Sequence, residues 1–310
     1  MKRFRVSTSW RGTLTALVTP FAADGAVDEN ALRALVDWQL KSGVEGIVPC
    51  GTTGEAATMT NDEHMGVIET VVSQVDGSAK VLAGVGGNDT RNVTLLGARA
   101  REMGADGILA VAPYYNKPTQ AGMVAHFLAI AEAVEIPLIL YNVPSRTSSN
   151  LLPDTVLQLA EHPNIVGIKE ASGDLGQVMQ ILAGRPAGFS VLSGEDHLTL
   201  AMISLGAEGV VSVVSNEVPA EMSDMVRQAL AGELDRAREI HYRLLGLMNA
   251  NFIETNPVPA KAALVMMGRI EENYRLPLVP MAPENRARLG AELEKLGLIE
   301  GAERNAESPA

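Results

Sequence analysis

One lysine stands at the end of a short apolar stretch, where its amine could act as a nucleophile. The stretch NIVGIK (164–169) runs through small and β-branched residues to Lys169 and then gives way to Glu170. Such a run is typical of a buried strand. An ordinary lysine has a pKa of about 10.4 and is an ammonium at neutral pH, but apolar surroundings disfavour that charge. Lys169 is therefore a candidate for a Schiff base with a carbonyl substrate. The alternative is an ion pair between Lys169 and Glu170 or another carboxylate.

Two hydroxyl residues follow another apolar run, in the sequence GTTGE (51–55). The side chains of Thr52 and Thr53, together with backbone N–H groups between glycines, can hold a small carboxylate. An ordinary polar turn has the same composition. A nucleotide phosphate loop is excluded, because no Gly-Lys-Ser/Thr sequence follows.

The sequence YNVPSRT (141–147) places an acid–base group near a cation. Tyr141 ends an apolar run and can pass protons to a neighbouring imine. The planar guanidinium of Arg146 suits a substrate carboxylate, although a surface ion pair is the alternative for an arginine.

Adjacent tyrosines occur in PYYNKP (113–118), in a chain with only 4% aromatic residues. Tyr114 and Tyr115 lie between prolines, and packing at an interface explains them as well as a role in a site does. Lys117 is the rival of Lys169 as a nucleophile. It ranks lower because a polar loop offers nothing that disfavours its charge.

Two further motifs give weaker signals. GVGGND (84–89) resembles the start of a dinucleotide fingerprint, but Asp89 replaces the final glycine, and close backbone packing explains the glycines better. SGEDH (193–197) could suggest a metal site. Adjacent residues rarely converge on one ion, however, so an acidic first helical turn is the simpler interpretation, and we predict no metal.

The elements that must position these residues follow an alternating pattern. Strands are expected at 13–19, 46–49, 80–85, 107–112, 137–142, 165–169, 189–193 and 209–213. Helices are expected at 28–42, 60–75, 90–103, 120–134, from 153, 175–182, 198–205, 219–231, 234–249, 257–267 and 284–296, with Asp28 and Thr60 as N-caps.

One phrase recurs at three helix-to-strand junctions, as GVEGIV (43–48), GADGIL (104–109) and GAEGVV (206–211). Its first glycine suits the left-handed residue that ends a helix, and its second opens a buried parallel strand. Eight units of this rhythm favour an α/β fold of the (β/α)8 TIM-barrel type over an open doubly wound sheet. Chemistry in such a barrel sits at the C-terminal ends of the strands.

We expect three segments along the chain. The catalytic barrel spans 12–231, a C-terminal helical region spans 232–300, and a flexible tail spans 301–310. The helical region reads as an appendage and not as a separate catalytic domain.

Composition excludes several classes of protein. A net charge of −12 argues against a nucleic-acid partner, and no apolar run approaches the ~20 residues of a membrane span. The single cysteine, Cys50, rules out an internal disulfide and fits a reducing compartment. The basic N-terminus lacks the apolar core of a secretory signal, so a cytoplasmic location is expected.

Six motifs together resemble those of the dihydrodipicolinate synthase/N-acetylneuraminate lyase family. They are GTTGE (51–55), PYYNKP (113–118), YNVPSRT (141–147), GIKEASG (167–173), LSGED (192–196) and NPVPAK (256–261). The resemblance covers residues 12–298. It implies a (β/α)8 barrel with a C-terminal helical region, a homotetramer built as a dimer of dimers, and no metal or organic cofactor.

The resemblance also implies an activity, that of a class I aldolase-type lyase. Pyruvate would condense with aspartate-4-semialdehyde in lysine and diaminopimelate biosynthesis. By this resemblance Lys169 forms the Schiff base and Tyr141 is the acid–base group beside it. Thr52 and Tyr115 complete a proton relay with Tyr141, and Tyr115 is expected to come from a neighbouring subunit.

The same resemblance assigns substrate-binding residues. Thr53 binds the carboxylate of pyruvate, and Arg146 binds the carboxylate of the aldehyde. The backbone around Val211 lies against pyruvate, and Gly194 is a further substrate-binding residue. An aldolase for a sugar acid such as 2-keto-3-deoxygluconate would use the same chemistry, but Arg146 favours a small carboxylated aldehyde. A non-catalytic binding barrel is the third alternative, and the presence of all these side chains counts against it.

Some members of the family that the chain resembles bind lysine as a feedback inhibitor at a subunit interface. The matching positions here are Ala56, Ala57, His64, Asn88 and Tyr114. Asn61 stands where such members often have histidine, and Asn92 stands where they have glutamate.

We predict weak or absent inhibition by lysine, because Asn92 lacks the negative charge that would hold the ligand's ammonium group. A titration of activity with lysine checks this. Strong inhibition at physiological lysine would refute it.

Overall fold

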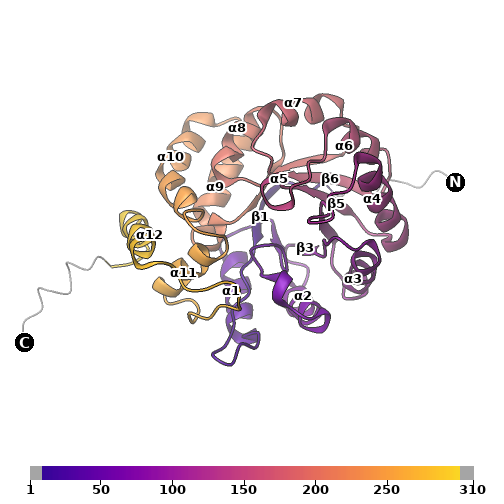
Figure 1. Cartoon of the computed structure of the whole chain (residues 1–310). Helices are drawn as coiled ribbons and strands as arrows, with labels where there is room; N and C mark the ends of the chain where they lie inside the picture. Colours follow the sequence, from indigo (N-terminus) through magenta and orange to yellow (C-terminus); the bar gives the residue numbers. More distant parts are fainter. Residues whose placement is uncertain (1–8, 301–310) are drawn as a thin grey trace, which may run out of the picture.

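Parallel strands close into a barrel in the computed structural model, which describes residues 9–300 (Figure 1). Each strand pairs with the next, and β1 pairs with β8, so the expected TIM barrel is confirmed. The expectations for residues 1–8 and 301–310 lie outside the described residues. The strands are β1 Gly12–Ala16, β2 Gly46–Val48, β3 Lys80–Gly84, β4 Gly107–Val111, β5 Leu138–Asn142, β6 Ile165–Glu170, β7 Ser190–Ser193 and β8 Gly209–Ser212.

Helices cover the outside of the barrel (Figure 1). Both expected N-caps are confirmed: Asp28 accepts from the N–H of Ala31, and Thr60 forms a capping box with Glu63. The helices are α1 Glu29–Lys41, α2 Asn61–Val75, α3 Thr90–Glu102, α4 Gln120–Val134, α5 Pro144–Thr147, α6 Pro153–Ala160, α7 Leu175–Gly184, α8 Thr199–Ser204 and α9 Pro219–Leu230, with short 3-10 turns η1 Ala56–Thr58, η2 Asp196–Leu198 and η3 Val214–Asn216.

The recurring glycine phrase has the conformation that the sequence predicts. Gly43, Gly104 and Gly206 have φ values of 81°, 93° and 113°, which a residue with a Cβ rarely adopts. The second glycine of each phrase is the first residue of β2, β4 or β8. The repeat therefore marks three equivalent helix-to-strand junctions of the barrel.

Apolar residues form one layer outside the ring of strands and one layer inside it. One lies between the strands and the surrounding helices, and the other fills the inside of the barrel. Trp10 closes the N-terminal end of the interior, where a Cβ on Gly107 would lie 2.7 Å from its ring. The interior layer consists of Trp10, Leu14, Ala16, Val48, Leu82, Leu109, Ile139, Tyr141, Val143, Ala171, Leu192 and Val211.

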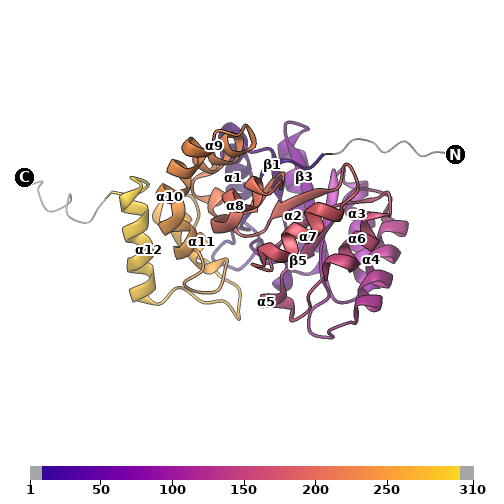
Figure 2. The ribbon, with the colours of Figure 1, turned by 90° about the horizontal axis from the view of Figure 1, so that it is seen from above.

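Three more helices extend the fold after α9, namely α10 Leu234–Ala250, α11 Val258–Met266 and α12 Pro283–Lys295. They share an apolar cluster with α8, β8 and α9. In both views α12 lies at the edge of the molecule opposite α4 (Figures 1 and 2). Within the described residues, every helix is too short or too polar to cross a membrane.

The structure differs from the sequence pattern most clearly at the end of β1 and directly after β5. The first strand ends at Ala16 and not at 19, because the N–H of Val18 bonds to the side chain of Asn216 instead of a strand. The pattern did not predict α5, a single turn that begins at Pro144, whose fixed φ suits a first helical position.

Substitution of Gly167 by alanine should destabilise the protein by about 1–3 kcal/mol, because the added Cβ would lie 2.6 Å from the carbonyl oxygen of Ser190. The matched control is Gly66→Ala in α2, where nothing lies within 4 Å and alanine should stabilise the helix by about 0.5–1 kcal/mol. Urea unfolding of both variants measures the difference. Equal effects at the two positions would contradict the packing argument.

Candidate active site

Lys169 lies inside the barrel at the C-terminal end of β6. It pairs in register with Tyr141 on β5 and Leu192 on β7, and only 6% of its surface is exposed. Within the described residues it forms no ion pair. Its Nζ lies 4.2 Å from the centroid of the Tyr141 ring. The amine is therefore held against an aromatic face, with apolar interior residues beneath it.

Glu170 belongs to the opposite face of β6, since successive strand residues alternate in direction. Its carboxylate accepts from the N–H of Ser172 at 2.7 Å and from the side-chain amides of Asn142 and Gln177 at 3.1 Å. Burial raises the pKa of Glu170, and these hydrogen bonds act in the opposite direction. An ion pair between Lys169 and Glu170, the alternative interpretation of the sequence, is therefore wrong.

A small cavity of about 30 Å³ opens over Lys169 at the C-terminal ends of the strands. Segments from β1, β2, β4, β5, β6 and the turns after β7 and β8 contribute to its wall. The lining residues are Ala16, Val48, Gly51, Thr52, Thr53, Leu109, Tyr141, Lys169, Gly194, Glu195, Val213, Phe252 and Asn256.

Gly194 allows the turn after β7 to pass directly over the lysine side chain. A Cβ at this position would lie 3.0 Å from Cε of Lys169 and 2.7 Å from the Cβ of Ala171. Any side chain at Gly194 would therefore displace the lysine from its present position.

The loop after β2 is fixed from two directions. Thr53 is buried and its hydroxyl accepts from the amide of Asn256 at 3.0 Å. Glu55, in a left-handed conformation with φ 56°, forms a buried ion pair of 2.7 Å with Lys261. Such a conformation costs a non-glycine residue roughly 1–3 kcal/mol, so the buried contacts must hold the loop in place.

Four other residues singled out in the sequence lie away from the cavity lining. Tyr115 is 89% exposed and has a φ of 71°, and Lys117 is also exposed. Arg146 is exposed at the mouth, where its guanidinium reaches the carbonyl of Asn256 at 3.5 Å. Val211 packs in the barrel interior.

Two further observations concern the expected site. Val213 lines the cavity, whereas the side chain of Val211 belongs to the apolar interior of the barrel. Within the described residues, no hydrogen bond joins the hydroxyl of Tyr141 to Thr52 or Tyr115, so one protomer does not by itself close the expected relay.

The sequence model of the dihydrodipicolinate synthetase family matches residues 9–296. The chain belongs to this family. It is 53% identical to the 4-hydroxy-tetrahydrodipicolinate synthase of Koribacter versatilis, over 94% of this chain and 98% of the relative.

Solved structures of family members are also similar. The dihydrodipicolinate synthase of Aquifex aeolicus is 46% identical with a TM-score of 0.92, covering 94% of this chain and 100% of that one. The enzyme of Acinetobacter baumannii, solved in complex with pyruvate, is 43% identical with a TM-score of 0.92, covering 93% and 99%. The family resemblance read from the six motifs is confirmed.

Among the cavity residues without a role assigned from the sequence, three are polar or aromatic, namely Glu195, Phe252 and Asn256. Glu195 belongs to the motif LSGED and Asn256 to the motif NPVPAK. Membership of these motifs was the sequence signal that could have indicated a place in the site. Phe252 lies between α10 and α11 and carries no local signal. Burial raises the pKa of Glu195, against the opposing effect of His197.

Some of the residues expected at a lysine site make hydrogen bonds in separate pairs. Asn88 donates to the carbonyl of Tyr114 at 3.2 Å, and Asn61 donates to Asn92 at 3.2 Å. Nε2 of His64 lies 2.7 Å from the carbonyl of Gly84, and burial lowers the pKa of this imidazole. Asn61 and Asn92 therefore form an uncharged amide pair.

Close packing, which the sequence suggested, explains two of the three glycines of GVGGND. A Cβ on Gly84 would lie 2.4 Å from the carbonyl oxygen of Cys50, and one on Gly86 would lie 2.3 Å from the nitrogen of Val111.

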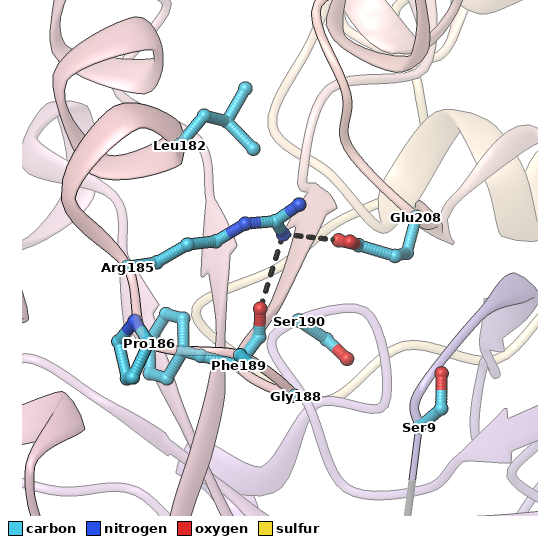
Figure 3. Close-up of a pocket in the computed structure, with 9 residues that line it drawn as sticks. Ser9, Leu182, Arg185, Pro186, Gly188, Phe189, Ser190 and Glu208 are labelled. Atoms are coloured by element: carbon cyan, nitrogen blue, oxygen red, sulfur yellow. Dashed lines mark hydrogen bonds and ion pairs between the residues drawn. The ribbon is translucent and has the colours of Figure 1, made fainter.

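A second hollow, of about 210 Å³, lies at the opposite end of the barrel before β7 and β8 (Figure 3). Arg185 lines this hollow. Its guanidinium donates to the carboxylate of Glu208 at 2.7 Å and to the carbonyl groups of Phe189 and Gly206, both at 3.1 Å. These contacts join the two strand starts, as expected for the stabilising end of a TIM barrel.

Replacement of Lys261 by methionine should destabilise the protein by about 3–5 kcal/mol, because Glu55 would be left as an unpaired buried charge. The double variant Lys261→Met/Glu55→Gln should recover part of that loss. The control is Lys295→Met, which breaks an exposed pair with Glu292 and should change stability by less than about 0.5 kcal/mol. Urea unfolding tests all three, and equal losses for Lys261→Met and Lys295→Met would contradict the argument.

Proposed function

We propose that this chain is a 4-hydroxy-tetrahydrodipicolinate synthase, which condenses pyruvate with aspartate-4-semialdehyde in lysine and diaminopimelate biosynthesis. The buried amine of Lys169, without a carboxylate partner and facing a cavity, is the observation that carries the proposal. The names and the high identity of the relatives support the same activity.

In the first half-reaction the amine of Lys169 attacks the keto carbon of pyruvate, and water leaves to give a protonated imine. Tyr141, in contact with the amine, transfers the protons. Thr53 and the N–H groups of its loop bind the pyruvate carboxylate. Gly194 leaves room for the adduct, and the backbone near Val211 and Val213 lies against it.

In the second half-reaction the imine loses a methyl proton and becomes an enamine, whose carbon attacks the aldehyde. The amine of the second substrate then closes the ring on the imine carbon and releases Lys169. Arg146, at the mouth of the cavity, binds the carboxylate of the second substrate. The imine formed with Lys169 is the electron sink in these reaction steps, so the proposed reaction needs no cofactor.

The proton relay is completed by a second copy of the chain. Tyr115 is exposed and held in a left-handed conformation, which is an arrangement that a partner subunit would stabilise. We therefore propose that Thr52 and Tyr141 of one protomer work with Tyr115 of its neighbour, in a homotetramer built as a dimer of dimers. Residues 12–231 form the catalytic barrel and 232–300 the helical region of this cytoplasmic enzyme.

Borohydride reduction in the presence of pyruvate should attach a pyruvyl group to Lys169 and to no other lysine. Lys169→Ala should abolish both the adduct, read by mass spectrometry, and turnover with aspartate-4-semialdehyde, because no other lysine of residues 9–300 lines the cavity. The matched control is Lys117→Ala, whose exposed side chain should be dispensable for the adduct. An adduct that persists in Lys169→Ala would contradict the proposal. Turnover of a sugar acid by the wild type, without turnover of aspartate-4-semialdehyde, would change the substrate assignment.

A further inference from the structure

Two buried acids lie directly behind the cavity wall. Asp196, in η2, and Glu217, just after η3, are 2% and 1% exposed. Asp196 follows the wall residue Glu195, and the fully buried Asn251 precedes the wall residue Phe252. None of these three buried side chains has a role in the mechanism above.

The two acids have different hydrogen-bond environments. One oxygen of Asp196 accepts from the backbone N–H groups of Val213 at 3.0 Å and Val214 at 2.8 Å. Neither carboxyl oxygen of Glu217 has a hydrogen-bond partner. The amide of Asn251 faces Glu217, but no atom of it reaches hydrogen-bonding geometry. Two backbone N–H groups in hydrogen-bonding geometry therefore stabilise a negative charge on Asp196. The groups that favour a charge on Glu217, its own N–H and the amide of Asn251, do not reach that geometry.

Few other charges act on the pair. Lys169 on β6 is the cation that acts on Asp196. Glu195 and His197 flank Asp196 in the chain. His197 acts on His241 of α10. Burial raises the pKa of both acids, and the charge of Asp196 raises that of Glu217 further. Ionising both acids in this interior would place two negative charges close together, with Lys169 as the cation that acts on Asp196, and this is strongly unfavourable.

We propose that Asp196 and Glu217 carry one negative charge between them, with Asp196 ionised and Glu217 neutral, and that this charge stabilises the cationic forms of Lys169. Asp196 is thus a positioning residue that acts through the lysine. The second part of the inference rests on the proposed imine chemistry. The first part, the charge state of the pair, stands independently of it.

The charge state is tested by thermal unfolding of E217Q between pH 5 and pH 8. A glutamate that is neutral when folded but ionised when unfolded lowers stability as pH rises above its unfolded pKa of about 4.3. Glutamine escapes that penalty, so Tm of E217Q should exceed that of the wild type by about 3 °C or more at pH 8. The difference should shrink towards pH 5. A lower Tm for E217Q at pH 8 would show that Glu217 is ionised and would overturn the assignment.

The action on Lys169 is tested by the pH dependence of pyruvate trapping with cyanoborohydride. Without the charge of Asp196 the ammonium form is less favoured, so D196N should shift the acid limb of the trapping rate to lower pH by about half a unit or more. E217Q should leave that limb unchanged. The matched control is D106N, which removes a carboxylate that accepts from the N–H of Val81 at the opposite end of the barrel.

The outcomes of the trapping experiment separate the two ideas. If the acid limb of the trapping rate is unchanged in D196N, or shifts equally in D106N, the electrostatic action of Asp196 on Lys169 is refuted. Failure of the wild type to form any adduct refutes the proposed function instead, and the Tm comparison still decides the charge state of the pair.

Discussion

The rest of this structure depends on holding one amine inside a closed ring of parallel strands. Alternation along β6 directs Lys169 inward and Glu170 outward, and the register with β5 places Tyr141 beside the amine. A slip of one residue would exchange the two faces and put the carboxylate inside. Closure of the barrel and the apolar layer beneath the site resist such a slip, because every interior side chain would have to move with it.

The C-terminal helices contribute to the site as well as to the exterior. Asn256 donates to Thr53, Phe252 lines the cavity, and Lys261 forms a buried pair with Glu55. All three come from α11 or the segment that precedes it, and they meet the loop after β2. The helical region is therefore a structural part of the cavity wall, and its attachment determines where the threonine loop lies.

Buried polar groups around the cavity have distinct environments that determine their charge. The carboxylate of Glu170 is surrounded by amide and N–H donors, whereas that of Glu55 is held by Lys261, whose pKa is lowered by burial. Asp196 receives backbone donors and Glu217 does not. The number of hydrogen-bond donors that the fold brings to each carboxyl group distinguishes these acids.

The sequence by itself determined the barrel, its strand order and the central lysine. The repeated glycine phrases and the eight apolar runs are local patterns, and the alternation of strands and helices leaves few topologies. Motif spacing also placed Thr52, Thr53, Tyr141 and Gly194 at the strand ends, where the cavity lies. These features depend on residues close together in the chain, so a single sequence contains them.

Only the tertiary structure decided which residues meet. It brought Val213, Phe252 and Asn256 into the wall and left Tyr115 outside. It also brought Asp196 and Glu217 together behind the wall, although their positions in the sequence suggest no relation. Such contacts depend on how helices that are distant in the sequence pack against the barrel. This packing leaves no periodic or compositional pattern in the sequence, so the sequence alone does not predict it.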